Sequence, residues 1–106
     1  MKKHEGMKIP KAFWLHGQRI EIVYDKLLGT MQGNRGEARY GYNEIRLLPI
    51  VEGDPQPKSK IDQAFFHELT HLILDHMEKD ELSKDEAFVN LFASLLHQAL
   101  TTAEYD

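Results

Sequence analysis

Two histidines and a glutamate at a fixed spacing are the residues of this chain best placed to do chemistry. His67, Glu68 and His71 form the pattern HExxH. On a helix the two histidines lie one turn apart on one face, where their neutral rings can bind one zinc ion. Glu68 stands about 100° around the axis from His67, beside the metal, where its carboxylate can act as a general base on a water molecule. The pattern therefore predicts a hydrolytic zinc site.

The residues around this motif have the spacing of a helix that buries one side. One arc of the helical wheel collects the apolar side chains Phe65, Phe66, Leu69, Leu72, Ile73 and Met77. We expect a helix from residue 60 to residue 76 or 77, with Ser59 as its N-cap. Such a helix is anchored through its apolar side and presents the motif to a cleft. The alternative is a surface helix on which two solvated histidines have this spacing by chance.

A catalytic zinc ion usually takes a third protein ligand, and the chain has no cysteine to supply it. A second helix is predicted to begin after Ser83 and to end near Thr101, antiparallel to the first because the connector is short. One narrow stripe of it is polar or small and contains Glu86, Asn90, Ala93 and His97. Glu86 heads this stripe and is the predicted third ligand. Asn90, one turn further, is placed to hydrogen-bond a ligand.

Glu86 also has a competing structural role. Ser83 and Glu86 match the capping box S-x-x-E, in which the glutamate closes the helix N-terminus instead of binding a metal. His97 shares the stripe but lies three turns beyond Glu86, so we do not assign it to the site. The opposite arc of this helix is apolar and is expected in the core; it contains Phe88, Leu91, Phe92, Leu95, Leu96, Ala99 and Leu100.

The N-terminal half has the alternation and the turn residues of short strands. We expect strands at 18–28, 37–40 and 44–48, the last two joined as a hairpin, with loops at 29–36 and 51–59. The predicted fold class is therefore α+β: a small N-terminal antiparallel sheet packed on two antiparallel C-terminal helices. We expect the 106 residues to form a single domain, 1–106.

Composition excludes several classes of function. The net charge of −4 argues against a nucleic-acid surface, which normally needs a basic face. The lack of cysteine excludes disulfide scaffolds, thiolate metal sites and cysteine nucleophiles. Neither a signal peptide nor a membrane-spanning segment is visible in the sequence, which predicts a soluble cytoplasmic protein without a membrane partner.

Two runs, HELTHLILDH and DEAFVNLFASLL, resemble the gluzincin-type ImmA/IrrE zinc metallopeptidases, including their small phage-borne versions. In that family the HExxH helix is followed by a helix of the form E-x-x-A-N-x-F-A-x-x-L-L. This chain departs from that form at Val89 and His97. It keeps the residues Glu86, Asn90, Phe92, Ala93 and Leu96.

The resemblance implies a zincin-like metallopeptidase with one Zn²⁺ per chain and a protein or peptide substrate. The phage-type resemblance further implies a repressor or another regulatory protein as that substrate. In such folds the edge strand beside the cleft pairs with an extended substrate, and the segment 44–48 is the expected equivalent. Two alternatives stay open: a zinc hydrolase that cuts a non-peptide bond, and a regulatory protein-binding module whose zinc is structural or vestigial. Glu68 favours catalysis, because a structural site needs no unligated carboxylate beside its metal.

Overall fold

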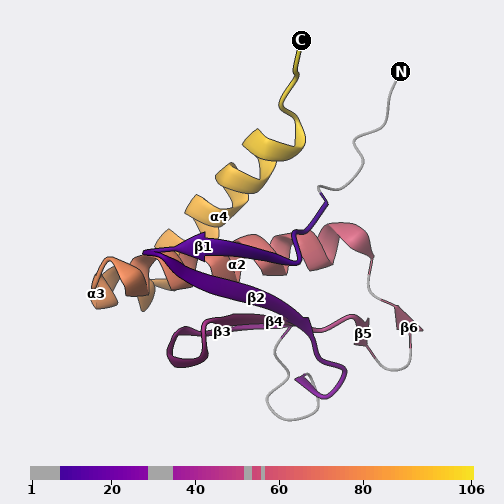
Figure 1. Ribbon diagram of the computed structural model, residues 1–106. Helices are drawn as coiled ribbons and strands as arrows, with labels where there is room; N and C mark the ends of the chain where they lie inside the picture. The colour runs from indigo at the N-terminus through magenta and orange to yellow at the C-terminus, as the bar shows by residue number, and fades with distance from the viewer. Residues whose placement is uncertain (1–7, 29–34, 52–53, 56) are drawn as a thin grey trace.

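The computed structural model describes residues 8–28, 35–51, 54–55 and 57–106 and has an α+β fold. Figure 1 shows its elements in chain order. The strands are β1 (Ala12–Leu15), β2 (Gln18–Tyr24), β3 (Gly36–Arg39), β4 (Glu44–Leu47), β5 (Ile50–Val51) and β6 (Asp54–Pro55). The helices are the 3₁₀ turn η1 (Tyr40–Tyr42), α2 (Lys58–His76), α3 (Asp80–Ser83) and α4 (Glu86–Thr101).

The main sheet has four strands in the order β1-β2-β4-β3. β1 and β2 form an antiparallel hairpin, β3 and β4 form a second one, and β2 pairs with β4 in parallel. The expectation of a wholly antiparallel sheet is therefore wrong. After β2 the chain forms the far edge strand β3 first, and β4 then returns between the two, alongside β2.

This order also corrects the position of the segment 44–48, which was expected to be an edge strand. β4 is an inner strand, and its Ile45 and Leu47 are fully buried, with 0% of their surface exposed. The edge strands of the sheet are β1 and β3. Of these two, β3 packs against α2, the helix that carries the HExxH motif.

Several element boundaries differ from the sequence-based ones for local reasons. The strand predicted at 18–28 ends at Tyr24, because the Asp25 side chain accepts a hydrogen bond from the backbone N–H of Leu27 and starts a turn. Strand β1 was not predicted from the sequence. Of the loop predicted at 29–36, residues 29–34 lie outside the described residues.

The helices also begin at other residues than expected. Helix α2 begins two residues earlier, with Pro57 rather than Ser59 at the N-cap position. The prediction of a loop at 51–59 is therefore wrong for Val51 and Asp54–Pro55, which belong to strands, and for the last two residues, which belong to α2. The connector between the two long helices contains the extra short helix α3. None of the helices in the described part of the chain is long and apolar enough to cross a membrane.

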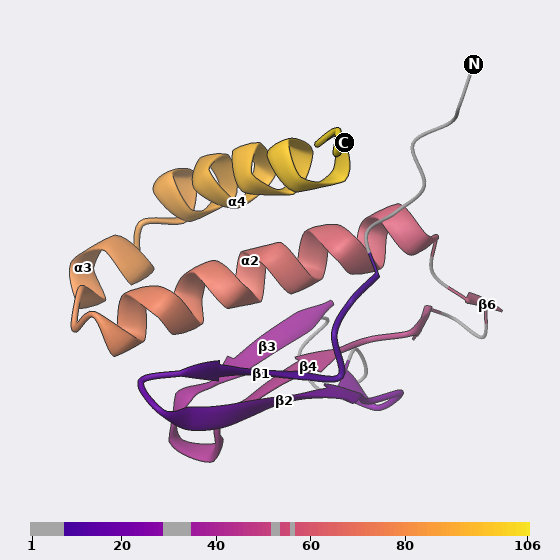
Figure 2. The same ribbon diagram turned by 45° about the horizontal axis from the view of Figure 1, so that its top comes forward.

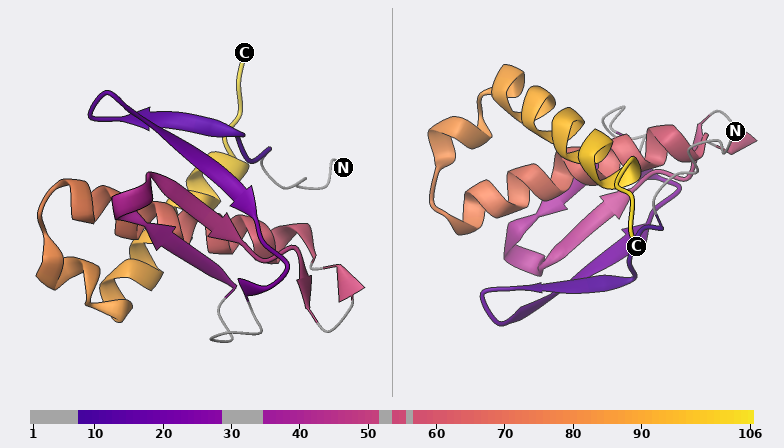
Figure 3. Two further views of the ribbon diagram at one scale, coloured as in Figure 1. Left: turned by 60° about the horizontal axis from the view of Figure 1, so that its bottom comes forward. Right: turned by 90° about the horizontal axis from the view of Figure 1, so that it is seen from above.

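The elements form three layers, with α2 in the middle (Figure 2). The sheet packs on one side of α2, and α4 runs back along the other side after α3 (Figures 2 and 3). The core that joins these layers consists of buried apolar side chains from all three: Ile20, Ile45, Leu47, Phe65, Phe66, Leu72 and Ala93. The motif helix is thus held on both sides, which keeps its histidines in a fixed position.

Helix α4 turns its apolar arc outward, contrary to expectation. Val89 and Ala93 are buried, whereas Leu91 and Leu95 expose 63% and 57% of their surface. The periodicity does not say which arc faces the core. The prediction that this apolar arc is buried is wrong for Leu91, Phe92, Leu95, Ala99 and Leu100, whereas Leu96 does pack against the core.

Because the apolar arc faces outward, two substitutions on α4 should change the stability of the fold by different amounts. We expect Val89→Ala to lower the free energy of unfolding by about 1–2 kcal/mol, because it removes two methyl groups from a fully buried position. Leu95→Ala should change it by no more than about 0.5 kcal/mol, because that side chain is largely exposed. Urea unfolding of the two variants measures both values, and a larger loss for Leu95→Ala would contradict the packing described above.

Candidate metal centre

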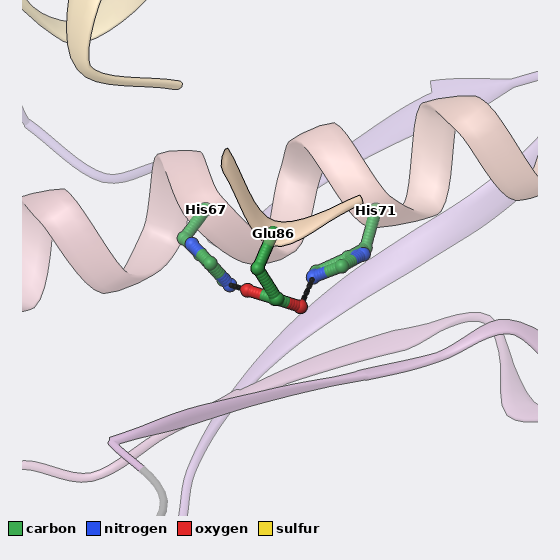
Figure 4. Close-up of side chains that lie close together, drawn as sticks. All are labelled: His67, His71 and Glu86. Atoms are coloured by element: carbon green, nitrogen blue, oxygen red, sulfur yellow. Dashed lines mark ion pairs between the residues drawn. The ribbon is translucent and has the colours of Figure 1, made fainter. Parts of the chain in front are cut away.

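The two histidines of the motif lie on one face of α2 and point to a common place (Figure 4). His67 and His71 are one turn apart, and their ring centroids are 4.9 Å from each other. Both side chains are partly buried, with 27% and 18% of their surface exposed. Partial burial suits a metal ligand, because the ring is held in place while one nitrogen still reaches the cleft.

Glu86 lies between the two rings. Its Oε2 atom is 3.6 Å from Nε2 of His67, and its Oε1 atom is 3.5 Å from Nε2 of His71. Figure 4 shows the carboxylate facing both imidazoles. One candidate ligand atom from each of the three residues can be chosen so that all lie within 4.8 Å of one another. The structure thus brings the three predicted ligands together from two different helices.

The start of α4 explains why the Glu86 side chain is available. Asp85 is the N-cap residue, and its carboxylate accepts a hydrogen bond from the backbone N–H of Phe88 at 3.1 Å. The helix begins at Glu86 itself, so Ser83 and Glu86 do not have the positions that a capping box requires. The capping alternative for these two residues is wrong, and Glu86 points away from its own helix toward the histidines.

Ser83 has a different role, which the sequence-based interpretation missed. Its Oγ atom lies 3.0 Å from Nδ1 of His71. When the Nδ1–H group of His71 donates to this oxygen, Nε2 keeps the lone pair that a metal needs. No local pattern could reveal this contact, because it depends on how α3 folds back onto α2.

Ser83→Ala should therefore weaken zinc binding, although a pure capping residue would leave it unchanged. We expect a loss of about tenfold in affinity, at the lower end of what the removal of such an orienting partner costs. Competition with a zinc-binding dye measures the affinity. Ser59→Ala, on the exposed first turn of α2, is the matched control and should bind zinc like the wild type. Equal affinities for both variants would show that Ser83 does not orient His71.

Asn90 contacts the other histidine. Burial lowers the pKa of His67, and the nearby His71 acts in the same direction. The Glu86 charge and a side-chain hydrogen bond with Asn90 oppose this change. A lowered pKa keeps the ring neutral at neutral pH, which is the form that binds metals. The structure thus places Asn90 beside His67, as Ser83 is beside His71.

Glu68 lies next to the three candidate ligands but does not belong to that group. Burial raises the pKa of Glu68 to about 7, and the carboxylates of Glu86 and Glu37 act in the same direction. The backbone N–H of Ala38, on strand β3, donates a hydrogen bond to the Glu68 side chain and acts against the rise. A cation bound by the two histidines and Glu86 would favour the ionised carboxylate.

Gly36 makes room for this arrangement. A Cβ atom at position 36 would lie 2.9 Å from Cγ of Glu68 and 3.2 Å from its Oε2 atom. Both distances are shorter than ordinary contacts, so any larger residue would displace the Glu68 side chain. Gly36 and Ala38 therefore fix Glu68 from two neighbouring positions of β3. This role of Gly36 is not visible in the sequence, where it looks like a loop residue.

We expect Gly36→Ala to reduce hydrolysis while leaving the metal in place. The three heavy atoms nearest to the new methyl group all belong to Glu68, so the substitution pushes Glu68 away from its hydrogen bond with Ala38. The predicted result is a fall in kcat of about tenfold or more with unchanged zinc content. Gly41→Ala is the matched control, because a Cβ atom there meets no heavy atom within 4 Å. A normal kcat for Gly36→Ala would show that this contact does not position Glu68.

Two cavities meet at the site. One has a volume of about 630 Å³ and extends between α2 and α4, and the other, of about 560 Å³, lies beside His71 and Glu86. Gly36, His67 and Glu68 line both of them. The candidate ligands therefore face an open cleft that runs to either side of the motif.

The donor set fits zinc. Two imidazole nitrogens and one carboxylate oxygen are the ligands of many catalytic zinc sites, which keep a further position open for water or substrate. Ser83 and Asn90 each support one of the histidines. Comparisons with protein-family models, curated proteins and solved structures found no significant match to this chain.

Proposed function

We propose that this chain is a zinc-dependent metallopeptidase of the zincin type. His67, His71 and Glu86 hold the zinc ion, and Glu68 is the general base. The observation that carries the proposal is the partly buried Glu68 carboxylate, which lies beside the metal donors and is not one of them. A structural zinc site has no task for such a group.

A zinc ion held by His67, His71 and Glu86 would supply Lewis-acid chemistry: it would polarise the carbonyl group of the scissile bond and make a water molecule more acidic. Glu68 takes a proton from the attacking water at its carboxylate oxygen and later delivers that proton to the leaving amine. Ala38 and Gly36 keep the carboxylate in position for both steps. Asn90 orients the His67 ring and Ser83 orients the His71 ring.

Strand β3 is the element along which a substrate would lie. It is an edge strand of the sheet and packs on the motif helix, so its outer backbone edge runs beside Glu68. An extended peptide can add to such an edge as a further strand, with main-chain hydrogen bonds that do not depend on sequence. This geometry favours a peptide substrate over a non-peptide one. A regulatory protein is the substrate that the phage-type resemblance implies.

Digestion of a peptide library tests the proposal. The zinc-loaded protein is incubated with a proteome-derived peptide mixture, and new termini are identified by mass spectrometry. We expect new termini that share positional preferences, that disappear after chelation and that return when zinc is added back. If loaded and chelated samples give the same termini, the proposal is wrong.

A further inference from the structure

A groove between α2 and α4 continues the metal centre in one direction. It is the cavity of about 630 Å³, and we call it the α2–α4 groove. Helix α2 lines it with Lys60, Gln63, Ala64 and His67, and helix α4 with Asn90, Ala93, Ser94 and His97. Both rows have the spacing of one helix face. The small side chains of Ala64 and Ala93 leave the space between the helices open.

The walls of the groove carry positive charge. Arg35 and Lys60 line it, and Glu68 is the only acidic residue among its described lining residues. Gln63 and Ser94 add side chains that can donate hydrogen bonds to an anion.

On the other side of the metal centre the charge is reversed. The cavity beside His71 is lined by Asp75 and Glu86, among other acidic residues, and no lysine or arginine belongs to its described lining. A substrate that crosses the site therefore meets opposite charges at its two ends. Opposite charges at the two ends of a cleft favour one direction and one charge pattern of the bound peptide.

The distance along α2 indicates where the positive end acts. Lys60 precedes His67 by two helical turns, which corresponds to about 10 Å along the axis. An extended peptide advances about 3.3 Å per residue. For the part of a peptide that extends along α2, a side chain that reaches Lys60 thus belongs to a residue about three positions away from the bond at the metal centre.

We propose that the α2–α4 groove binds an acidic side chain of the substrate, two or three residues from the bond that is cut. The inference rests on the proposed peptidase function and specifies its substrate: a peptide with Asp or Glu on that side. Lys60 and Arg35 attract the carboxylate, and Ser94 and Gln63 hydrogen-bond it. His97, whose ring stacks on Phe66 at 5.2 Å between centroids, forms a fixed part of the wall.

Peptide binding to the metal-free protein tests the groove without any need for cleavage. The probes are two alanine-based hexapeptides with blocked ends, identical except for one central Glu or Gln, and binding is followed by NMR of the labelled protein. We expect the Glu peptide to bind roughly fivefold more tightly than the Gln peptide, because the positive charges of Lys60 and Arg35 face its carboxylate. The shifted signals should include the backbone amides of Ala64 and Ser94.

Charge reversal identifies the residue responsible. Lys60→Glu should make the Gln peptide the tighter ligand, and the exposed position of Lys60 in the first turn of α2 lets the variant fold. Lys79→Glu, at the N-cap of α3 just beyond the opposite end of α2, has the same change of net charge and should keep the preference for the Glu peptide. Equal binding of both peptides, no binding at millimolar concentration, or equal effects of the two variants would overturn the inference.

The binding and cleavage results together distinguish a failure of the groove assignment from a failure of the peptidase proposal. If the Glu peptide binds at the groove while the zinc-loaded protein cuts no peptide, the groove stands and the peptidase proposal fails. If the protein cuts peptides with no preference for an acidic residue on one side, and the two probes bind equally, the peptidase proposal stands and the groove assignment fails.

Discussion

Glu68→Gln should abolish most of the hydrolytic activity and leave the zinc site intact. Glutamine has the shape of glutamate, and its amide oxygen can still accept the hydrogen bond from Ala38. It cannot take up a proton from water, so kcat should fall by about 10²-fold or more, because positioned acid–base catalysis contributes roughly 10²–10⁴-fold. The measurement is kcat on peptides identified in the library digestion, together with zinc content.

Glu44→Gln is the matched control. It makes the same chemical change on strand β4, on a carboxylate that pairs with Arg46. It should retain kcat within a factor of a few. If Glu68→Gln cuts the same peptides at the rate of the wild type, Glu68 is not the base and the proposed mechanism is wrong.

His71→Ala should remove the metal. The wild type is expected to bind about one zinc ion per chain, as a site with three protein ligands does. Loss of His71 leaves one imidazole and one carboxylate, and this pair does not hold the ion through dialysis. His67→Ala should have the same effect. Elemental analysis after dialysis gives the zinc-to-protein ratio for each variant.

Two further variants make this prediction specific. His16→Ala removes an exposed histidine on the β1–β2 turn and should keep the full zinc content. Glu86→Gln should weaken zinc binding clearly without the complete loss seen for a histidine, because an amide oxygen is a poorer ligand than a carboxylate. A zinc-to-protein ratio near one for the double variant His67→Ala/His71→Ala would place the metal elsewhere.

The residues of the metal centre could be predicted because, on a helix, the spacing of two residues in the sequence determines the angle between their side chains. One helix carries His67, Glu68 and His71, so their relative directions follow from about 100° per residue. The stripe that leads from Glu86 to Asn90 follows from the same rule on α4. The structure brings these residues together even though the predicted starts of both helices were inexact by two residues.

Contacts between distant segments could not be predicted. Ser83 reaches His71 only because α3 folds back, and Gly36 matters only because β3 packs on Glu68. The inner position of β4 and the outward apolar arc of α4 are likewise properties of packing between elements. Alternation or periodicity within one segment does not show which neighbour it will have.

The proposed peptidase function depends on the claim that His67, His71 and Glu86 hold a zinc ion. X-ray absorption at the zinc edge, on wild-type protein loaded with one equivalent, tests this claim most directly. We predict about four nitrogen or oxygen ligands at ~2.0–2.1 Å, with the outer-shell scattering of two imidazole rings. A shell of about six oxygen atoms without imidazole scattering, as expected for zinc held loosely by surface carboxylates and water, would contradict the account.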